Sequence, residues 1–436
     1  MPQPVSQMKA WLIVTLLFFF MFINFADKLV IGLAAGPIMR DLELTPSQFG
    51  YIASSFFFLF SLSGLCTGFI VNRVATKYAL TAMSLVWAAA QFLVVGAASY
   101  GTLLTSRILL GAGEGPATPV SLHSLYKWFE NERRTFPASI MNSLGAAAGV
   151  FASAPILAWI IQAYGWQAAF GTLGVVGLMW VALWLLLGAE GPISDPVPEQ
   201  GASTVEWPRI SYGRLLTSRT FIGSVCCGFA AYWTVTLVVS WVPSFLNKSL
   251  GYDSQTAAWL VSLESAIAAG FAFLVGWASQ AMLQAGVSSR RARGLLTGAF
   301  AVASGIALCS MTYLPSDSVK LALLIAGLAI PNGIYPLVFA MVGEIVPTRQ
   351  RGAALATLAA IFTSAGLVAP TVMGYAVERG ATVEGGFSNG FLVTSAILLA
   401  AGVIGLLIIN PEADRSRILQ GSVPDPASSL VTSAGR

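Results

Sequence analysis

Long apolar stretches separated by short polar segments make up most of this chain. Twelve of them approach or exceed 20 residues, the length that an α-helix needs to cross the hydrocarbon core of a bilayer. Continuous apolar runs favour helices over a membrane barrel, whose strands would show short alternating segments. The predicted spans are residues 10–35, 47–71, 79–99, 101–126, 137–163, 168–187, 221–246, 256–279, 295–314, 322–345, 353–377 and 389–409.

Composition supports this interpretation. Of 436 residues, 56% are hydrophobic and 10% are charged, and the mean hydropathy is +0.76. Soluble domains carry about 25% charged residues, so this chain has too few charges to cover a water-facing surface. The four cysteines lie in apolar runs and there is one histidine. We therefore expect an all-α integral membrane protein without a cofactor, a metal cluster, a nucleic-acid partner or an enzymatic nucleophile–base set.

Lysine and arginine predict the orientation, because cytoplasmic loops of membrane proteins carry an excess of both. With the N-terminus placed in the cytoplasm, seventeen of the 23 basic residues fall on the cytoplasmic side and four in outward loops. The remaining two, Lys28 and Arg107, lie within spans. Both termini are therefore expected to be cytoplasmic.

A proline-rich polar stretch divides the twelve spans six and six. The predicted parts are a first six-helix bundle (1–189), a cytoplasmic linker (190–220), a second bundle (221–410) and a cytoplasmic tail (411–436). Basic loops recur after spans two and eight and after spans four and ten. This recurrence suggests an internal duplication, which is typical of transporters built from two pseudo-symmetric halves.

Charged residues inside the spans are the candidates for function. Arg107 and Glu114 are separated by seven residues, so they lie on nearly one helix face, about 10 Å apart along the axis. Asp27 and Lys28 interrupt span one, and Glu264 stands alone in span eight. Intramembrane charges nearly always face a protein interior or a water-filled cavity. Small residues between Arg107 and Glu114 leave room for a neighbouring helix or a substrate.

Each of these charges also has a structural explanation. Arg107 and Glu114 could form a static buried ion pair between helices. Asp27 and Lys28 could pair near the outer membrane interface, with the lysine reaching outward. Glu264 could be a hydrogen-bonded structural group.

The loop after span two carries the first family resemblance. Gly68, Asn72, Arg73, Ala75 and Lys77 form a degenerate version of the Gly-x-x-x-Asp-Arg-x-Gly-x-Lys/Arg motif of the major facilitator superfamily. The resemblance extends over essentially all twelve spans. It implies the fold of two six-helix bundles, with this loop acting as a cytoplasmic gate.

Two further segments resemble the anion:cation symporter family, which includes sugar-acid and phthalate transporters. They are Asn24-Phe-Ala-Asp27-Lys28, and the Arg-x-x-x-Gly-x-x-Glu-x-Pro stretch from Arg107 to Pro116. The resemblance implies that Arg107 and Lys28 contact an anionic substrate and that Asp27 and Glu114 are proton-linked carboxylates. Lys28 stands where arginine is usual, so a bidentate clamp becomes a point charge.

Span eleven lacks the asparagines that are frequent there in sugar-acid transporters. Because hydroxyl-rich substrates need several donors and acceptors, we expect a more apolar or aromatic carboxylate. The other candidate substrate-binding residues are polar or aromatic residues in spans five, seven, ten and eleven: Asn142, Tyr232, Trp233, Asn332, Tyr335, Thr363 and Ser364.

The leading hypothesis is a monomeric proton-coupled importer of an organic anion in a bacterial inner membrane. The four charges of the first half sum to zero, so an added monocarboxylate leaves a net negative charge that one proton cancels. Glu114 is the first candidate for the proton and Asp27 the second, and Glu264 could be another. Sodium remains an alternative coupling ion. The alternative functions are a drug/proton antiporter, which Pro155 at the wrong distance from Gly149 argues against, and a non-transporting sensor.

Overall fold

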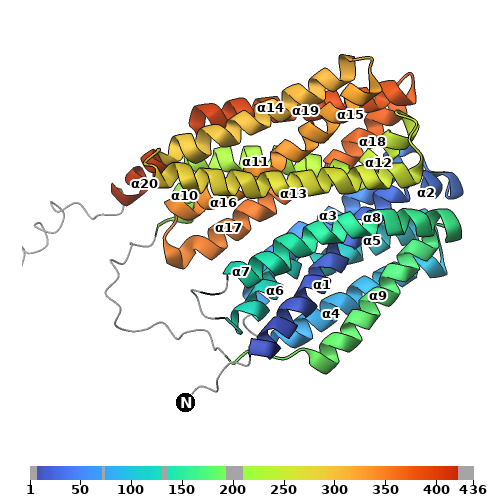
Figure 1. The fold of residues 1–436 in the computed structure, drawn as a ribbon, viewed down its shortest axis with the longest axis horizontal. Helices are drawn as coiled ribbons and strands as arrows, with labels where there is room; N and C mark the ends of the chain where they lie inside the picture. The colour runs from blue at the N-terminus through green and yellow to red at the C-terminus, as the bar shows by residue number, and fades with distance from the viewer. Residues whose placement is uncertain (1–6, 71–73, 130–132, 134, 193–209, 421–436) are drawn as a thin grey trace, which may run out of the picture.

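The structure is a computed structural model that describes residues 7–70, 74–129, 133, 135–192 and 210–420. Helices account for almost all of these residues (Figure 1). Ten helical segments of the described part are long and apolar enough to cross a membrane. The other two predicted spans correspond to α3 (Pro46–Ile70) and to α5 (Tyr100–Glu114) with α6 (Ala117–Tyr126). The all-helical membrane fold predicted from hydropathy is confirmed.

The helices form two bundles that lie one above the other in Figure 1. Besides α3, α5 and α6, the first bundle contains α1 (Gln7–Leu33), α2 (Ala35–Asp41), α4 (Thr76–Gly96), α7 (Thr135–Ser139), the π-helical turn η1 (Ile140–Leu144), α8 (Gly145–Tyr164) and α9 (Trp166–Leu187).

The second bundle follows a similar order. It contains α10 (Tyr212–Leu216), α11 (Arg219–Ser240), α12 (Val242–Lys248), α13 (Ser254–Gln284), η2 (Arg290–Leu295), α14 (Leu296–Tyr313), α15 (Asp317–Ala329), η3 (Ile330–Gly333), α16 (Ile334–Ile345), α17 (Thr348–Thr363), η4 (Ser364–Leu367), α18 (Ala369–Arg379), α19 (Val383–Ile408) and α20 (Pro411–Gln420).

Several predicted spans are interrupted rather than continuous. Span four breaks at Gly115–Pro116 between α5 and α6, and span ten breaks at η3, where Pro331 follows Ile330. Proline lacks the N–H that a helix interior requires, so a kink or break at these positions is expected. In a membrane such irregular backbone is tolerated where neighbouring helices surround it.

The small residues of span four serve helix packing. A Cβ added to Gly111 would overlap the carbonyl oxygen of Phe56, and one added to Gly115 would overlap that of Phe60. A Cβ at Gly113 would come within 2.6 Å of the Trp87 ring. Helices α3 and α4 therefore pack directly against the glycines of α5, where the absence of side chains allows the helices to approach closely.

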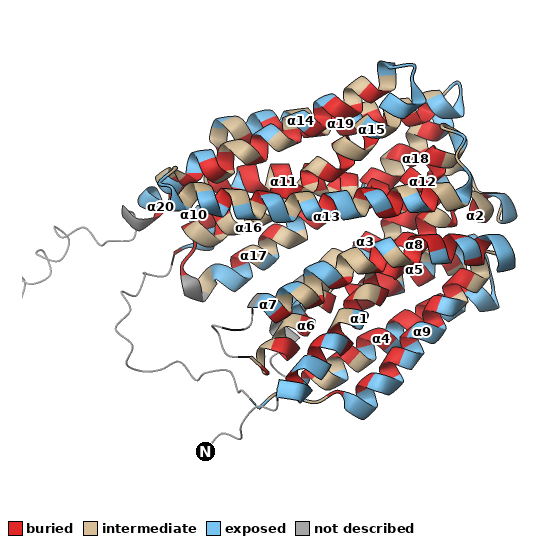
Figure 2. Cartoon of the chain, in the orientation of Figure 1, coloured by how far each residue is buried: buried red, intermediate tan, exposed pale blue. Residues whose placement is uncertain are grey.

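The outer surfaces of the bundles are apolar. Figure 2 shows buried positions where helices face one another and exposed positions along their outer sides. Phe273, Trp277, Leu186 and Leu407 are exposed on 66% to 80% of their surface. Apolar surface on this scale would be unfavourable in water and suits contact with lipid chains.

Hydrogen bonds between the two bundles gather away from the end where α1 begins and α20 lies, which we call the terminal end. At the opposite end, the Ser47 amide donates to the Glu378 carboxylate at 2.9 Å, and the hydroxyls of Tyr51 and Tyr375 share a hydrogen bond. Nearer the middle, Ser61 and Thr363 are bonded at 2.9 Å. At the terminal end, α6 and α7 stand apart from α16 and α17 (Figure 1). The bundles are thus joined at the opposite end.

At the terminal end of the first bundle, Glu190 ties α4 to α6. Its carboxylate accepts hydrogen bonds of 2.8 Å from the Thr76 hydroxyl, the Lys77 amide and the Lys127 ammonium. Burial by itself would raise the pKa of Glu190, but these bonds outweigh it and lower the pKa below its usual 4.5. The carboxylate therefore neutralises the N-terminus of α4 as well as Lys127.

Glu190→Gln should remove a pH-dependent part of the stability. Because the pKa of Glu190 is lowered by folding, its contribution is present above pH 4.5 and is lost as the pH falls through the lowered value. We expect the melting temperature at neutral pH to fall by about 1–3 °C, and its decline in acid to become shallower. Melting curves between pH 3 and 7, with the exposed Glu43→Gln as control, provide the measurement. Superimposable curves for wild type and Glu190→Gln would contradict this role.

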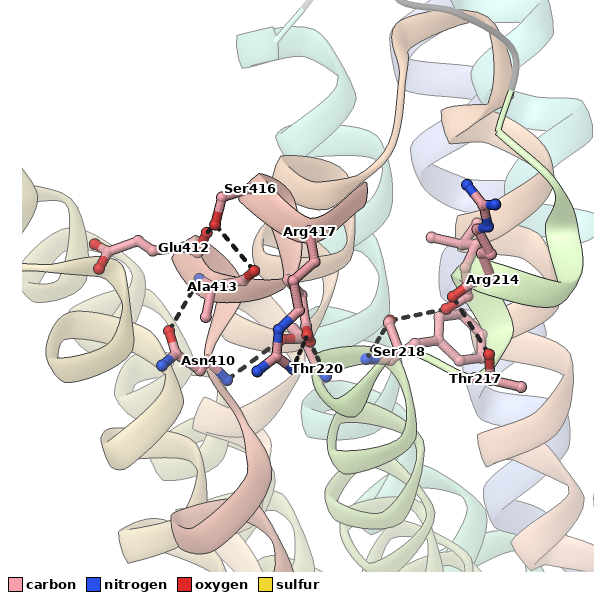
Figure 3. Close-up of polar contacts among 12 residues, drawn as sticks. Arg214, Thr217, Ser218, Thr220, Asn410, Glu412, Ala413, Ser416 and Arg417 are labelled. Carbon is pink, nitrogen blue, oxygen red and sulfur yellow. Dashed lines mark hydrogen bonds and ion pairs between the residues drawn. The ribbon is translucent and has the colours of Figure 1, made fainter. Parts of the chain in front are cut away.

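The terminal end of the second bundle is held by α20. Figure 3 shows its first turn against the start of α11. The Thr220 amide donates to the Asp414 carboxylate at 2.6 Å, and the Asn410 amide donates to the Thr220 hydroxyl at 3.3 Å. Asn410 in turn accepts from the Ala413 amide at 3.2 Å, which caps α20. These contacts fasten α20 to the base of α11.

Candidate functional site

Arg107 lies on the face of α5 that is turned toward α1. Its side chain is buried, with 2% of the residue exposed, and it donates a hydrogen bond of 3.3 Å to the main-chain oxygen of Asp27. The guanidinium lies 4.9 Å from the centre of the Phe56 ring. Its Nε has no hydrogen-bond partner in the described structure. The arginine is thus held by α1 and α3 while keeping donors for a further acceptor.

Glu114, seven residues along, pairs with Lys28 and not with Arg107. The Lys28 Nζ lies 2.7 Å from the Glu114 Oε2, and Asn24 accepts a second bond from the same ammonium. Both charges are buried, with 1% of Glu114 and 8% of Lys28 exposed. The two alternatives weighed from sequence, an Arg107–Glu114 ion pair and an outward-reaching Lys28, are therefore wrong.

Aromatic rings surround the Lys28 ammonium. Its Nζ lies 4.8 Å from the ring centre of Phe25, 5.3 Å from that of Phe60 and 5.8 Å from that of Phe56. A cation over desolvated rings gains about 2 kcal/mol per good contact. These rings therefore stabilise a lysine that burial would otherwise disfavour.

Asp27 points in another direction, toward α4. Its Oδ1 accepts a hydrogen bond of 2.7 Å from the Gln91 amide, and 1% of each residue is exposed. Gln91 is the polar partner that the sequence analysis missed. A lone glutamine in the apolar run 79–99 was the available signal, because a buried amide in a membrane helix needs a partner.

The four charged side chains occupy one buried region of the first bundle. Two cations and two carboxylates give a formal sum of zero. Four of the polar atoms in this region have no hydrogen-bond partner in the described structure: Arg107 Nε, Glu114 Oε1, Gln91 Oε1 and Asn24 Nδ2. Buried polar atoms are usually satisfied, so unpaired donors and acceptors at this density are typical of a site that binds a ligand, solvent or a proton.

Glu264 lies apart from this region, on α13 of the second bundle. It is 4% exposed, and the Ser265 hydroxyl donates to its Oε2 at 3.3 Å. No ion pair joins it to a basic residue in the part of the chain that the structure describes. The structure thus separates Glu264 from the four charges of the first bundle.

Two of the other candidates lie in an aromatic cluster between the bundles. The Tyr232 ring is 5.9 Å from that of Phe57 and 5.8 Å from that of Phe362, and the Tyr335 ring is 5.7 Å from that of Phe362. Trp233, by contrast, faces α19, where its Nε1 donates to the Thr394 hydroxyl at 3.1 Å.

The remaining polar candidates already have protein partners. Asn142 accepts from Thr118 at 3.4 Å, and the Asn332 amide nitrogen donates to the Leu328 main chain at 3.1 Å. Ser364 donates to the Ile361 main chain at 2.6 Å. Thr363, as described above, bonds Ser61 across the bundles. These side chains are engaged in helix and inter-bundle contacts.

The predicted gating loop is only partly described. Asn72 and Arg73 lie outside the described residues, and Gly68 is described only as part of α3. Lys77 lies at the start of α4, where its Nζ donates to the Leu185 main chain at 2.9 Å. Within the described part, this loop position therefore links α4 to α9.

Fold, buried charges and apolar exterior together define a helical membrane transporter. The family model of the Major Facilitator Superfamily matches residues 17–330 and 224–433, and the chain belongs to that family. It is therefore a multi-pass secondary transporter and not an enzyme. The predicted membership of this superfamily is confirmed.

Several relatives within the superfamily are named as transporters of organic anions. The chain is 27% identical over 409 residues to the probable sulfoacetate transporter of Cupriavidus necator, covering 89% of this chain and 91% of that protein. It is 26% identical over 398 residues to the hexuronate transporter of Bacillus subtilis, covering 89% and 92%. These relatives agree with the resemblance to the anion:cation symporters.

Solved structures show the same fold at lower identity. A bacterial homologue of the human lysosomal transporter Spinster, inward-facing and occupied, matches with a TM-score of 0.79 and 18% identity over 97% of this chain and 100% of that one. The D-xylose-proton symporter matches with a TM-score of 0.71 and 14% identity over 93% and 99%. At these identities the likeness establishes the fold alone.

Proposed function

We propose that this protein imports an organic carboxylate together with one or more protons across the bacterial inner membrane. The observation that carries the proposal is the balanced, buried set of Asp27, Lys28, Arg107 and Glu114. The names of the relatives support an anionic substrate, since sulfoacetate and hexuronate are organic anions. The excess of basic residues at the terminal end supports cytoplasmic termini.

Arg107 is the first contact proposed for the substrate. Its Nε is unpaired and its only described hydrogen bond goes to a main-chain oxygen, so the guanidinium can still clamp a carboxylate. Lys28 is the second contact. It is already paired with Glu114, so a substrate carboxylate that binds Lys28 competes with that glutamate.

This competition couples the proton to the anion. When the substrate takes over Lys28, Glu114 loses the ammonium that compensates its charge. A buried carboxylate without a cation is strongly unfavourable, so Glu114 binds a proton. The closed states are then accessible to the empty site and to the site with anion and proton together, and rocking of the two bundles carries both across.

Uptake into proteoliposomes tests the function directly. A thermal-shift screen of sulfoacetate, glucuronate, glucarate and benzoate first identifies an acid that stabilises the purified protein. We expect uptake of that acid to be driven by a proton gradient, inside alkaline, and to collapse when a protonophore is added. Uptake that is insensitive to the protonophore and requires sodium would show that the coupling ion is Na⁺ and not H⁺. Failure of every carboxylate to bind would overturn the proposed function.

A further inference from the structure

Six aromatic rings form a continuous cluster beside Lys28. Three come from α3 and three from the second bundle: Phe56, Phe57, Phe60, Tyr232, Tyr335 and Phe362. Ring centres lie 5.2 Å apart for Phe56–Phe60 and 6.0 Å for Phe57–Phe60. The contacts of Tyr232 and Tyr335 described above extend the cluster into the second bundle.

The cluster reaches from the charged region to the interface between the bundles. Phe56 and Phe60 contact Lys28 at one side of it, and at the other side Tyr232 lies 5.8 Å from Phe362, ring centre to ring centre. Phe60, Tyr232 and Tyr335 are each partly exposed. The Tyr335 hydroxyl is buried and has no hydrogen-bond partner in the described structure.

Three polar side chains of the helices that carry this cluster are already engaged in hydrogen bonds. Thr363 and Ser61 bond each other, and the amide nitrogen of Asn332 is bonded within its own helix. A sugar acid presents several hydroxyls, and each needs a partner to offset its desolvation. A ring-bearing acid instead buries its apolar body against other rings and needs polar contacts at its ends.

We propose that the transported anion is an aromatic carboxylate, whose acid group binds Arg107 and Lys28 and whose ring packs in the cluster of Phe60, Tyr232 and Phe362. This inference rests on the proposed function and adds the substrate class. A substrate ring among Phe60, Tyr232 and Phe362 contacts both bundles at once. Binding would therefore couple the movement of the first bundle to that of the second. The unpaired Tyr335 hydroxyl supplies a partner for a polar group on the ring.

Binding to purified protein, followed by calorimetry, tests the class. We expect benzoate and 4-hydroxybenzoate to bind at least tenfold more tightly than glucuronate or glucarate. Tyr232→Leu removes a ring and should weaken benzoate at least tenfold, while Tyr232→Phe keeps the ring and should stay within threefold of wild type. Phe300→Leu, which removes a ring paired with Phe271 outside the cluster, is the matched control.

Tyr335→Phe separates a ligand contact from packing. The substitution preserves the ring, so it should weaken 4-hydroxybenzoate several-fold and leave benzoate unchanged. Tight binding of glucuronate with no binding of benzoate would overturn the aromatic class while the proposed transport of a carboxylate stands. If none of the four acids binds, both inferences fail.

Discussion

Replacing Arg107 with alanine is expected to abolish substrate binding and transport. Charge-assisted hydrogen bonds contribute about 1.5–3 kcal/mol each, and 1.4 kcal/mol corresponds to a factor of ten, so the loss of a bidentate clamp should weaken binding about 100-fold or more. Arg107 is 2% exposed and has an unpaired Nε, whereas the other buried cation of the site, Lys28, is already paired with Glu114. Calorimetry with the best-binding acid measures the effect.

Two variants control for this experiment. Arg107→Lys keeps the charge and loses the planar fork, so it should bind with intermediate affinity. Lys320→Ala removes a basic residue whose partner Glu384 is exposed, and it should leave binding unchanged. A melting curve confirms that each variant is folded. A folded Arg107→Ala protein with unchanged affinity would make Arg107 a structural residue.

Glu114→Gln is expected to stop proton-driven accumulation while sparing exchange of anion for anion. Glutamine cannot take the proton, but it fills the same space between Lys28 and α5. Because the variant leaves Lys28 without its partner carboxylate, a monoanion alone restores neutrality in the site. The loaded site can then change conformation in either direction without a proton, which is exchange without accumulation.

The measurement compares two assays on the same proteoliposomes. Gradient-driven uptake should fall to background, and counterflow of labelled anion should persist, with no proton flux reported by an internal pH dye. Asp27→Asn and Glu264→Gln are the comparison variants, because their carboxylates contact Gln91 and Ser265 and not Lys28. Normal accumulation in Glu114→Gln would contradict this assignment. If accumulation were instead lost in Asp27→Asn or in Glu264→Gln, the carboxylate replaced in that variant would be the proton site.

Much of the site was predictable because charges in apolar helices are rare. Asp27, Lys28, Arg107 and Glu114 are visible in the sequence for that reason, and they do lie in one buried region. Their pairing was not predictable, because periodicity places residues on a face of one helix but does not say which helix faces it. Lys28 on α1 therefore pairs with Glu114 on α5, while Arg107 of the same face bonds a main-chain oxygen.

Contacts made by amide groups and aromatic rings between distant parts of the chain were harder still to predict. Gln91 and Asp27 are 64 residues apart, and Ser47 and Glu378 are 331 residues apart. Such contacts depend on how separate helices pack, and helix packing depends on side-chain shape over the whole surface. An aromatic residue in a membrane helix has several ordinary roles, so Tyr232 and Trp233 look alike in sequence although one contacts the cluster and the other contacts α19.

The sequence by itself determined that this protein is a bundle of membrane-spanning helices with four charges in its first half. The physical reason is that a bilayer requires about 20 apolar residues per helix and penalises every charge within them, so both features are local and countable. Only the tertiary structure decided which charges touch, that the small residues of α5 admit α3 and α4, and that rings from both bundles meet beside Lys28. Those outcomes arise from close packing between distant segments, which no local pattern encodes.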